Sequence, residues 1–296
     1  MNIMNSRIRG ILAVMVLAVL VLLAHTEPVS ARVKSGTLGE KKGNIQKWSY
    51  DTKTKVLTIE GKGWMEEYIT TGWDQYASKV KKIVVKGSIK NLYGACFWGF
   101  DEVESVVLTD TIEEIGYNAF DDTRKLKKIT LPKNLKKIDS YAFSGSGIEE
   151  VVIPDGVTVI EEYAFEDGNF RKVKLGRKTK ILKSDAFSGN EKLSDIALPD
   201  TMESIQKYAF SYCGLKTVTI PKNVREIGNA AFLKNRKLKK MVIKSHKIEK
   251  WGEDIFYGNE QKIKVVVPKE KYEEYKKKIQ ESGAGKNVKV VASGKW

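Results

Sequence analysis

Residues 148–165 read IEEVVIPDGVTVIEEYAF, and this unit recurs along the chain with small variations. An apolar alternation (Ile148, Val151 and Ile153) leads to a proline, and an Ala-Phe pair ends the unit at Phe165. A fixed period predicts a repeat solenoid, a stack of similar coils. Eight of the ten phenylalanines occupy the position of Phe165, at steps of 22 to 24 residues: Phe97, Phe120, Phe143, Phe165, Phe187, Phe210, Phe232 and Phe256.

The segment between the strand and the phenylalanine has a nearly constant length. Seven of the eight units run 12 residues from the last strand position to the phenylalanine, as from Ile220 to Phe232. The unit from Ile243 to Phe256 is one residue longer, and the other length changes fall in turns rich in glycine and serine. We therefore take the strand-to-phenylalanine segment as the fixed structural unit.

A strand of about five residues with one apolar face cannot bury that face alone. We expect consecutive units to pair their strands, about 4.8 Å apart, into one long parallel sheet. Each phenylalanine then lies inside its coil, above and below the rings of its neighbours, and the eight rings form a structural spine. Four isoleucines, each five residues before a phenylalanine, suit a short helical or irregular return on the convex side: Ile138, Ile160, Ile205 and Ile227.

The recurring pattern, apolar-x-x-Ile-x-Leu-Pro, then Val-x-x-Ile, then Tyr-Ala-Phe, resembles the BspA-like leucine-rich repeats of exported bacterial proteins. Tyr-Ala-Phe stands at residues 141–143, 163–165 and 208–210, and the match covers about residues 80–268. The resemblance implies a curved solenoid of about nine coils with the parallel sheet on its concave face. It also implies a surface or secreted protein that binds host or partner proteins.

The first 31 residues have the pattern of a signal peptide. A basic start (Arg7 and Arg9) precedes the apolar stretch 11–24, which is shorter than the ~20 residues that span a membrane. The small residues at 29–31 fit a cleavage site. We therefore expect an exported chain, secreted or held at the cell surface without a covalent link, with no membrane span after signal removal.

Residues 32–79 do not fit the repeat and are expected to form an amino-terminal cap. The stretches 48–51 and 56–59 read as the two strands of a β-hairpin, and three of the six tryptophans fall in this segment. A solenoid needs a cover for the open edge of its first coil, and large aromatic side chains supply one. A sugar-binding platform is the alternative for these aromatic rings.

The solenoid is expected to occupy residues 80–268, as eight full units followed by a final strand. Residues 269–296 are expected to form a carboxyl-terminal cap. Within it, a helix is predicted for 269–281, with a helical stripe of Tyr272, Tyr275 and Ile279, and a strand for 288–291.

Basic residues exceed acidic residues by a wide margin. The full chain has 52 Lys and Arg against 37 Asp and Glu, and a net charge of +15. Loss of Arg7, Arg9 and Glu27 with the signal peptide changes this charge to +14. Such a field attracts polyanions, and the competing explanation is that exposed lysines keep an elongated molecule soluble.

Residues with catalytic or metal-binding chemistry are scarce. His246 is the only histidine after the signal peptide, so it has no histidine partner for a metal site or for acid–base chemistry. Cys96 and Cys213 lie five coils apart, too far for a disulfide, and neither has a nearby histidine to activate it. The sequence contains no phosphate-binding loop and no nucleophile elbow. We expect no enzyme activity, no cofactor and no metal site.

The outward residues of the expected sheet form two columns, one mainly basic and one small or β-branched. We expect this concave face to bind a partner, because the second column supplies apolar area and the lysines attract the partner. The competing explanation is that β-branched residues are good strand formers. The candidate residues are Lys82, Val84, Lys128, Thr130, Glu150, Val152, Lys172, Lys174, Thr217, Thr219, Lys240 and Val242.

Trp98 and Phe100 are a second aromatic candidate, for which packing against the amino-terminal cap is the competing role. Together these patterns favour a non-catalytic interaction protein whose partner is a host or bacterial protein. Binding of an anionic glycan or wall polymer through the basic surface is the alternative. No specific nucleic-acid binding is expected.

Overall fold

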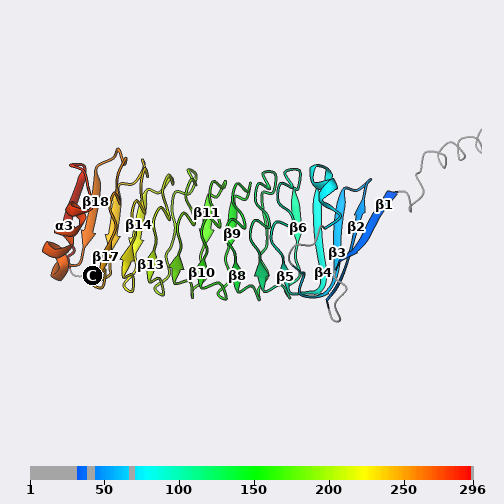
Figure 1. Cartoon of the computed structure of the whole chain (residues 1–296). Helices are drawn as coiled ribbons and strands as arrows, with labels where there is room; N and C mark the ends of the chain where they lie inside the picture. The colour runs from blue at the N-terminus through cyan, green and yellow to red at the C-terminus, as the bar shows by residue number, and fades with distance from the viewer. Residues whose placement is uncertain (1–31, 39–43, 67–70, 295–296) are drawn as a thin grey trace, which may run out of the picture.

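The computed structural model describes residues 32–38, 44–66 and 71–294, and the expected signal peptide lies outside the described residues. Figure 1 shows an elongated stack of coils, with a group of strands at the amino-terminal end and a helix at the carboxyl-terminal end. The chain is a parallel-strand β-solenoid of about ten turns with little helix. Each coil has three sides: a long strand, a short strand, and a turn that carries the phenylalanine.

The long strands lie parallel to one another, one coil apart, and we call the surface they form the long-strand face. Its strands are β4 (Lys82–Ile89), β6 (Ser105–Val107), β9 (Glu150–Val152), β11 (Lys172–Lys174), β14 (Thr217–Ile220), β16 (Lys240–Ile243) and β18 (Ile263–Val267). Neighbouring strands pair residue for residue, as in Lys82↔Ser105. Single bridges such as Lys128↔Glu150 connect coils that lack a named strand.

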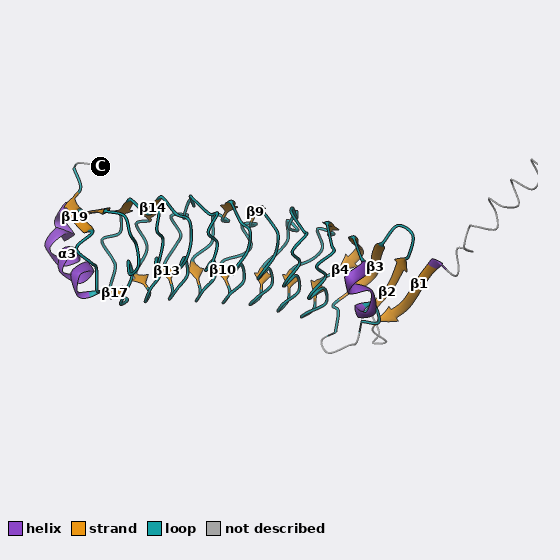
Figure 2. Cartoon of the chain, turned by 90° about the horizontal axis from the view of Figure 1, so that it is seen from above, coloured by secondary structure: helices purple, strands orange, loops and turns teal. Residues whose placement is uncertain are grey.

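A second ladder of two-residue strands forms what we call the short-strand face. Its members are β5 (Asn91–Leu92), β7 (Glu114–Ile115), β8 (Lys137–Ile138), β10 (Val159–Ile160), β12 (Ile181–Leu182), β13 (Ser204–Ile205), β15 (Glu226–Ile227) and β17 (Lys250–Trp251). Figure 2 shows the two rows of strands on opposite sides of the stack, with β9 and β14 on one side and β10 and β13 on the other. The expected helical or irregular return is therefore a short parallel strand followed by a turn.

The third side of each coil is a turn with two residues in the left-handed backbone region. Every unit has one such residue two positions before its phenylalanine and another two positions after it, such as Tyr163 (φ 59°) and Asp167 (φ 47°). This conformation is costly for residues other than glycine. Inter-coil hydrogen bonds offset the cost: the N–H groups of Tyr163, Phe165 and Asp167 all donate to carbonyls of the next coil, that of Phe165 at 3.0 Å to Ala186.

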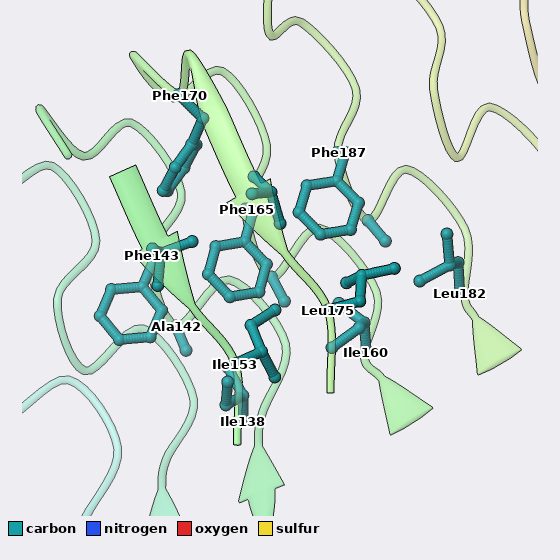
Figure 3. Close-up of a cluster of buried hydrophobic side chains, with 14 of the residues drawn as sticks. Ile138, Ala142, Phe143, Ile153, Ile160, Phe165, Phe170, Leu175, Leu182 and Phe187 are labelled. Atoms are coloured by element: carbon teal, nitrogen blue, oxygen red, sulfur yellow. The ribbon is translucent and has the colours of Figure 1, made fainter. Parts of the chain in front are cut away.

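The eight repeat phenylalanines are buried inside the coils. Figure 3 shows Phe143, Phe165 and Phe187 from successive coils, and their rings stack with centroids 5.4 Å and 5.1 Å apart and planes within 9°. The stack runs from Phe97 to Phe232, and the buried indole of Trp73 extends it at the amino-terminal end, 6.1 Å from Phe97.

Phe256 is buried but makes no ring contact with the other described aromatic residues. Its unit is the one with the extra residue between strand and phenylalanine.

Three strands precede the first coil: β1 (Val33–Leu38), β2 (Ile45–Asp51) and β3 (Val56–Gly63). β2 and β3 form the expected antiparallel hairpin, and β1, which the sequence did not predict, pairs antiparallel with β2. β3 then pairs in parallel with β4. A 3-10 helix, η1 (Asp74–Lys79), lies between β3 and β4 in the chain, and Trp48 and Trp73 pack edge to face at 6.2 Å.

The carboxyl-terminal end contains η2 (Lys269–Lys271), α3 (Tyr272–Glu281) and β19 (Val288–Ala292). Tyr275 and Ile279 of α3 are buried, and the Tyr275 ring packs on Trp251 at 5.0 Å. β19 pairs in parallel with β18. β3 and β19 continue the ladder of the long strands at its two ends, and the solenoid has about ten turns, close to the nine expected. We propose that the segments 32–79 and 269–296 cap the stack.

Candidate binding surfaces

Exposure on the long-strand face follows the pleat of its strands. In β11, Lys172 and Lys174 are exposed and Val173 between them is buried. The same alternation exposes ten of the twelve candidate residues and leaves Val84 and Val242 half-buried. The structure therefore brings all twelve to one face, in two columns that run along the stack.

The second of these columns carries exposed apolar side chains. Val107 is 48% exposed and Val152 is 60% exposed. Val84 stands beside Val107 in the register of β4 and β6, and Thr219 stands beside Val242 in the register of β14 and β16. The valines of this column supply apolar area, and apolar area is enriched at the centre of protein–protein interfaces.

The lysines of the long-strand face make no ion pair with any described residue. Lys172 stands beside Glu150 in the register of β11 and β9, yet their charged atoms are too far apart to pair. Residues at the edge of the face do pair, as in Lys81–Glu104 at 3.1 Å. The lysines without an ion pair are Lys82, Lys128, Lys172, Lys174, Lys240 and Lys264.

Several charges beside the short-strand face are paired across coils. The Glu113 carboxylate accepts hydrogen bonds from Lys90 at 2.7 Å and from Lys136 at 2.6 Å, and so connects three successive coils. The ammonium groups of Lys136 and Lys90 lower the pKa of Glu113 to about 2. Lys180 and Glu203 pair in the same way at 3.0 Å.

On the turn side of the coils, the rings of Tyr117, Tyr141 and Tyr163 contact one another in a row, which we call the tyrosine strip. Tyr117 meets Tyr141 edge to face at 5.6 Å, and Tyr141 stacks on Tyr163 at 4.5 Å. Carboxylates surround this strip. The pKa of Glu166 is raised to about 7, mainly by burial and further by the negative charges of Asp167, Asp185 and Asp121. Two members of the strip, Tyr141 and Tyr163, occupy the tyrosine position that recurs in the repeat.

A cavity of about 790 Å³ lies where the amino-terminal strands meet the first coils, and we call it the end cavity. Residues from five separate stretches of the chain line it, so no single motif could predict it. Those with aromatic or charged side chains are Trp64, Asp74, Tyr93, Glu114, Tyr117 and Asp139.

The tryptophans of the amino-terminal segment divide into two groups. Trp48 and Trp73 are buried, so their rings are part of the core, whereas Trp64 is 46% exposed and lines the end cavity. Of the second aromatic pair, Phe100 is buried against Phe97 at 5.7 Å, and Trp98 is 58% exposed.

Neither cysteine has the surroundings of a nucleophile. Both thiols are free and buried, and burial raises the pKa of Cys213 to about 12 and that of Cys96 well above its ordinary value. His246 lies on the surface beside Glu249 and Lys271. Within the described ranges, no group of three or more His, Cys, Asp or Glu side chains could hold a metal ion. No helix in those ranges is both long enough and apolar enough to cross a membrane.

A parallel ladder of long strands, a ring stack and one turn per unit define a leucine-rich-repeat solenoid protein. The family model described as "BspA type Leucine rich repeat region" matches residues 74–193 and 160–279, with six copies of the repeat. The chain belongs to this family.

Solved structures of bacterial proteins share the fold. A leucine-rich repeat protein from Eubacterium ventriosum is 20% identical, with a TM-score of 0.53 and 79% of each chain covered. One from Bacteroides ovatus is 21% identical, with a TM-score of 0.55, and the match covers 80% of this chain and 70% of that one. No curated protein matches the chain.

Proposed function

We propose that this protein is a non-catalytic interaction protein, secreted or held at the cell surface, that binds a protein partner through the long-strand face. Six lysines without ion pairs carry the proposal; five lie in the first column, and Lys174 lies in the neighbouring column of mainly small or β-branched residues. Residues 1–31 would direct export, and the caps would protect the two ends of the stack.

The lack of ion pairs matters because a paired lysine must give up its carboxylate before it can contact a partner. A free ammonium has no such cost, and a partner carboxylate gains the full attraction. The apolar column beside the lysines adds contact area that excludes water. The combination fits an acidic protein surface with apolar residues at its centre.

The arrangement of charge supports a protein partner more than a polyanion. The first column alternates lysines with neutral or acidic residues, among them Ser105, Glu150, Asp195 and Thr217. A polyanion would gain most from an unbroken basic stripe, because each phosphate or sulfate needs its own cation. Binding of an anionic glycan or wall polymer is the alternative, and the test below separates the two.

The test starts from the secreted chain, residues 32–296, used to capture partners from host matrix and mucus extracts. Each captured protein is purified, and its affinity is measured for a triple charge reversal, Lys128→Glu, Lys172→Glu and Lys240→Glu. The matched control is Lys178→Glu, Lys207→Glu and Lys250→Glu, three exposed lysines outside the long-strand face that lack ion pairs with described residues. Both triples change the net charge equally.

We expect the first triple to weaken binding by about tenfold or more, and the control triple to change it by less than about threefold. Equal effects of the two triples on every partner would assign the binding to net charge or to another face. Strong retention of the wild-type chain on heparin that disappears steeply with salt, without any protein partner, would support the polyanion alternative.

A further inference from the structure

The end cavity is walled by aromatic rings from two parts of the chain. Trp64 follows β3 of the amino-terminal strands, and Tyr93 and Tyr117 follow the short strands β5 and β7 of the first coils. Trp64 is 46% exposed and Tyr117 is 50% exposed, whereas Tyr93 is buried. Two large rings therefore remain accessible to a ligand in an opening that already has the volume of a small-molecule site.

The charge of the end cavity is opposite to that of the molecule. Among the described residues, its lining includes the carboxylates of Asp74, Glu114 and Asp139 and no lysine or arginine, on a chain with a net charge of +15. Lys137, outside the lining, donates to Glu114 at 2.9 Å and to Asp139 at 2.7 Å and so holds these two side chains in place. Asp74 is exposed and makes no ion pair with the residues that the structure describes.

Aromatic rings together with carboxylates favour a cation that has an apolar stem. The ring faces attract positive charge, and the carboxylates complete an ion pair with it. Lysine and arginine side chains meet both demands, because their methylene groups pack on the rings while the charged end reaches the carboxylates. An anionic ligand would be repelled here, and a neutral sugar would leave Asp74 without a counter-charge.

We propose that the end cavity binds a lysine or arginine side chain from an extended basic segment of a partner protein. The tyrosine strip begins at Tyr117, a residue of the cavity wall, and continues over the next two coils. Asp185, Glu166 and Glu162 lie near Tyr163, the far end of the strip. The strip therefore offers further aromatic and acidic contacts to the same segment, on a surface separate from the long-strand face.

The experiment uses residues 32–296 and a fluorescein-labelled peptide of alternating lysine and serine, with binding followed by fluorescence anisotropy. We expect Trp64→Ala to weaken binding by about tenfold, from loss of the cation–aromatic contact, and Asp74→Asn to weaken it by about threefold. The matched control is Trp98→Ala, which removes an indole that is 58% exposed and outside the cavity lining. Thermal unfolding of each variant checks the fold, and both substituted side chains of the cavity are exposed.

Absence of peptide binding would overturn the proposal, as would equal affinities of wild type, Trp64→Ala and Asp74→Asn. Binding of a neutral chito-oligosaccharide that depends on Trp64 would assign the cavity to sugars instead. Self-association lost in Trp64→Ala, measured by sedimentation velocity, would assign it to a second copy of this chain.

Discussion

The long-strand and short-strand faces both place charged residues one coil apart, but they use these charges differently. Beside the short-strand face, Glu113 lies between Lys90 and Lys136 and makes hydrogen bonds with both. On the long-strand face, Lys172 and Glu150 are neighbours in the ladder and do not pair. A lysine that reaches a neighbouring carboxylate loses side-chain entropy, and Lys172 does not make that contact with Glu150.

This difference separates the residues that stabilise the stack from those that remain available to a partner. Ion pairs between coils add a small stabilisation each and tie neighbouring units together. The lysines of the long-strand face make no ion pairs with described residues, and we infer that they are available for intermolecular contacts. Substitutions in the core that both faces share, and then on each face, can test this division.

The largest expected effect is the truncation of a central ring of the stack. Phe165→Ala removes stacking on both Phe143 and Phe187 and should lower the free energy of unfolding by about 3–5 kcal/mol. Phe256→Ala is the comparison, because that ring is buried outside the stack, and it should cost less. Urea unfolding followed by circular dichroism measures both. Equal losses would show that stacking adds nothing beyond burial.

The next effect concerns the turn side, where Glu166 has a pKa raised to about 7. A carboxyl with a raised folded-state pKa binds its proton more tightly in the folded chain, so stability should fall as pH rises through 7. Glu166→Gln should therefore be more stable than wild type at pH 8, and the difference should shrink toward pH 5. Thermal unfolding across this range is the measurement, with the exposed neighbour Glu162→Gln as control. The same pH dependence in both variants would contradict this account.

A smaller effect of opposite sign is expected beside the short-strand face. The pKa of Glu113 is lowered from 4.5 to about 2, so its ion pairs stabilise the fold above pH 4.5 and are lost as pH falls toward 2. Glu113→Gln should destabilise the chain at neutral pH and lose less stability than wild type on acidification. Glu150→Gln, on the long-strand face, removes no ion pair with a described residue and is the control. A matching change in both variants would remove the distinction between the two faces.

The smallest effect is expected for a lysine of the long-strand face. Lys172→Ala removes no ion pair within the described part of the chain, so the free energy of unfolding should change by less than about 0.5 kcal/mol. Lys136→Ala, which removes a hydrogen bond to Glu113, is the comparison and should cost more. Replicate urea titrations can rank the two. The reverse ranking would mean that the long-strand lysines contribute to the stack.

The sequence predicted the coils because Phe165 and its equivalents recur at a nearly fixed period, and such a period has few physical solutions. The short-strand face was predicted only as a return, since strands of two residues such as β10 have no alternation to detect. Trp73 was expected to cap the stack, but its place at the head of the ring stack was not predicted. It precedes the first repeat unit and therefore lies outside the period.

The exposed columns were predictable from the pleat, because strand residues alternate between the two faces of a sheet. The ion pairing of the lysines and the end cavity could not be predicted from the sequence. Whether Lys172 pairs with Glu150 depends on side-chain conformation, which the period does not determine. The end cavity joins Trp64, Asp74 and Tyr117 from segments that differ in sequence pattern, and only the fold brings them together.

The most direct test of the division between the two faces is lysine labelling of the wild-type chain, alone and with a captured partner, read by mass spectrometry. We predict that Lys128, Lys172 and Lys240 react readily in the free protein and become protected in the complex. Lys178, Lys207 and Lys250 should keep their reactivity in both samples. Protection of the second group, with the first group still reactive, would contradict the assignment of the long-strand face as the binding surface.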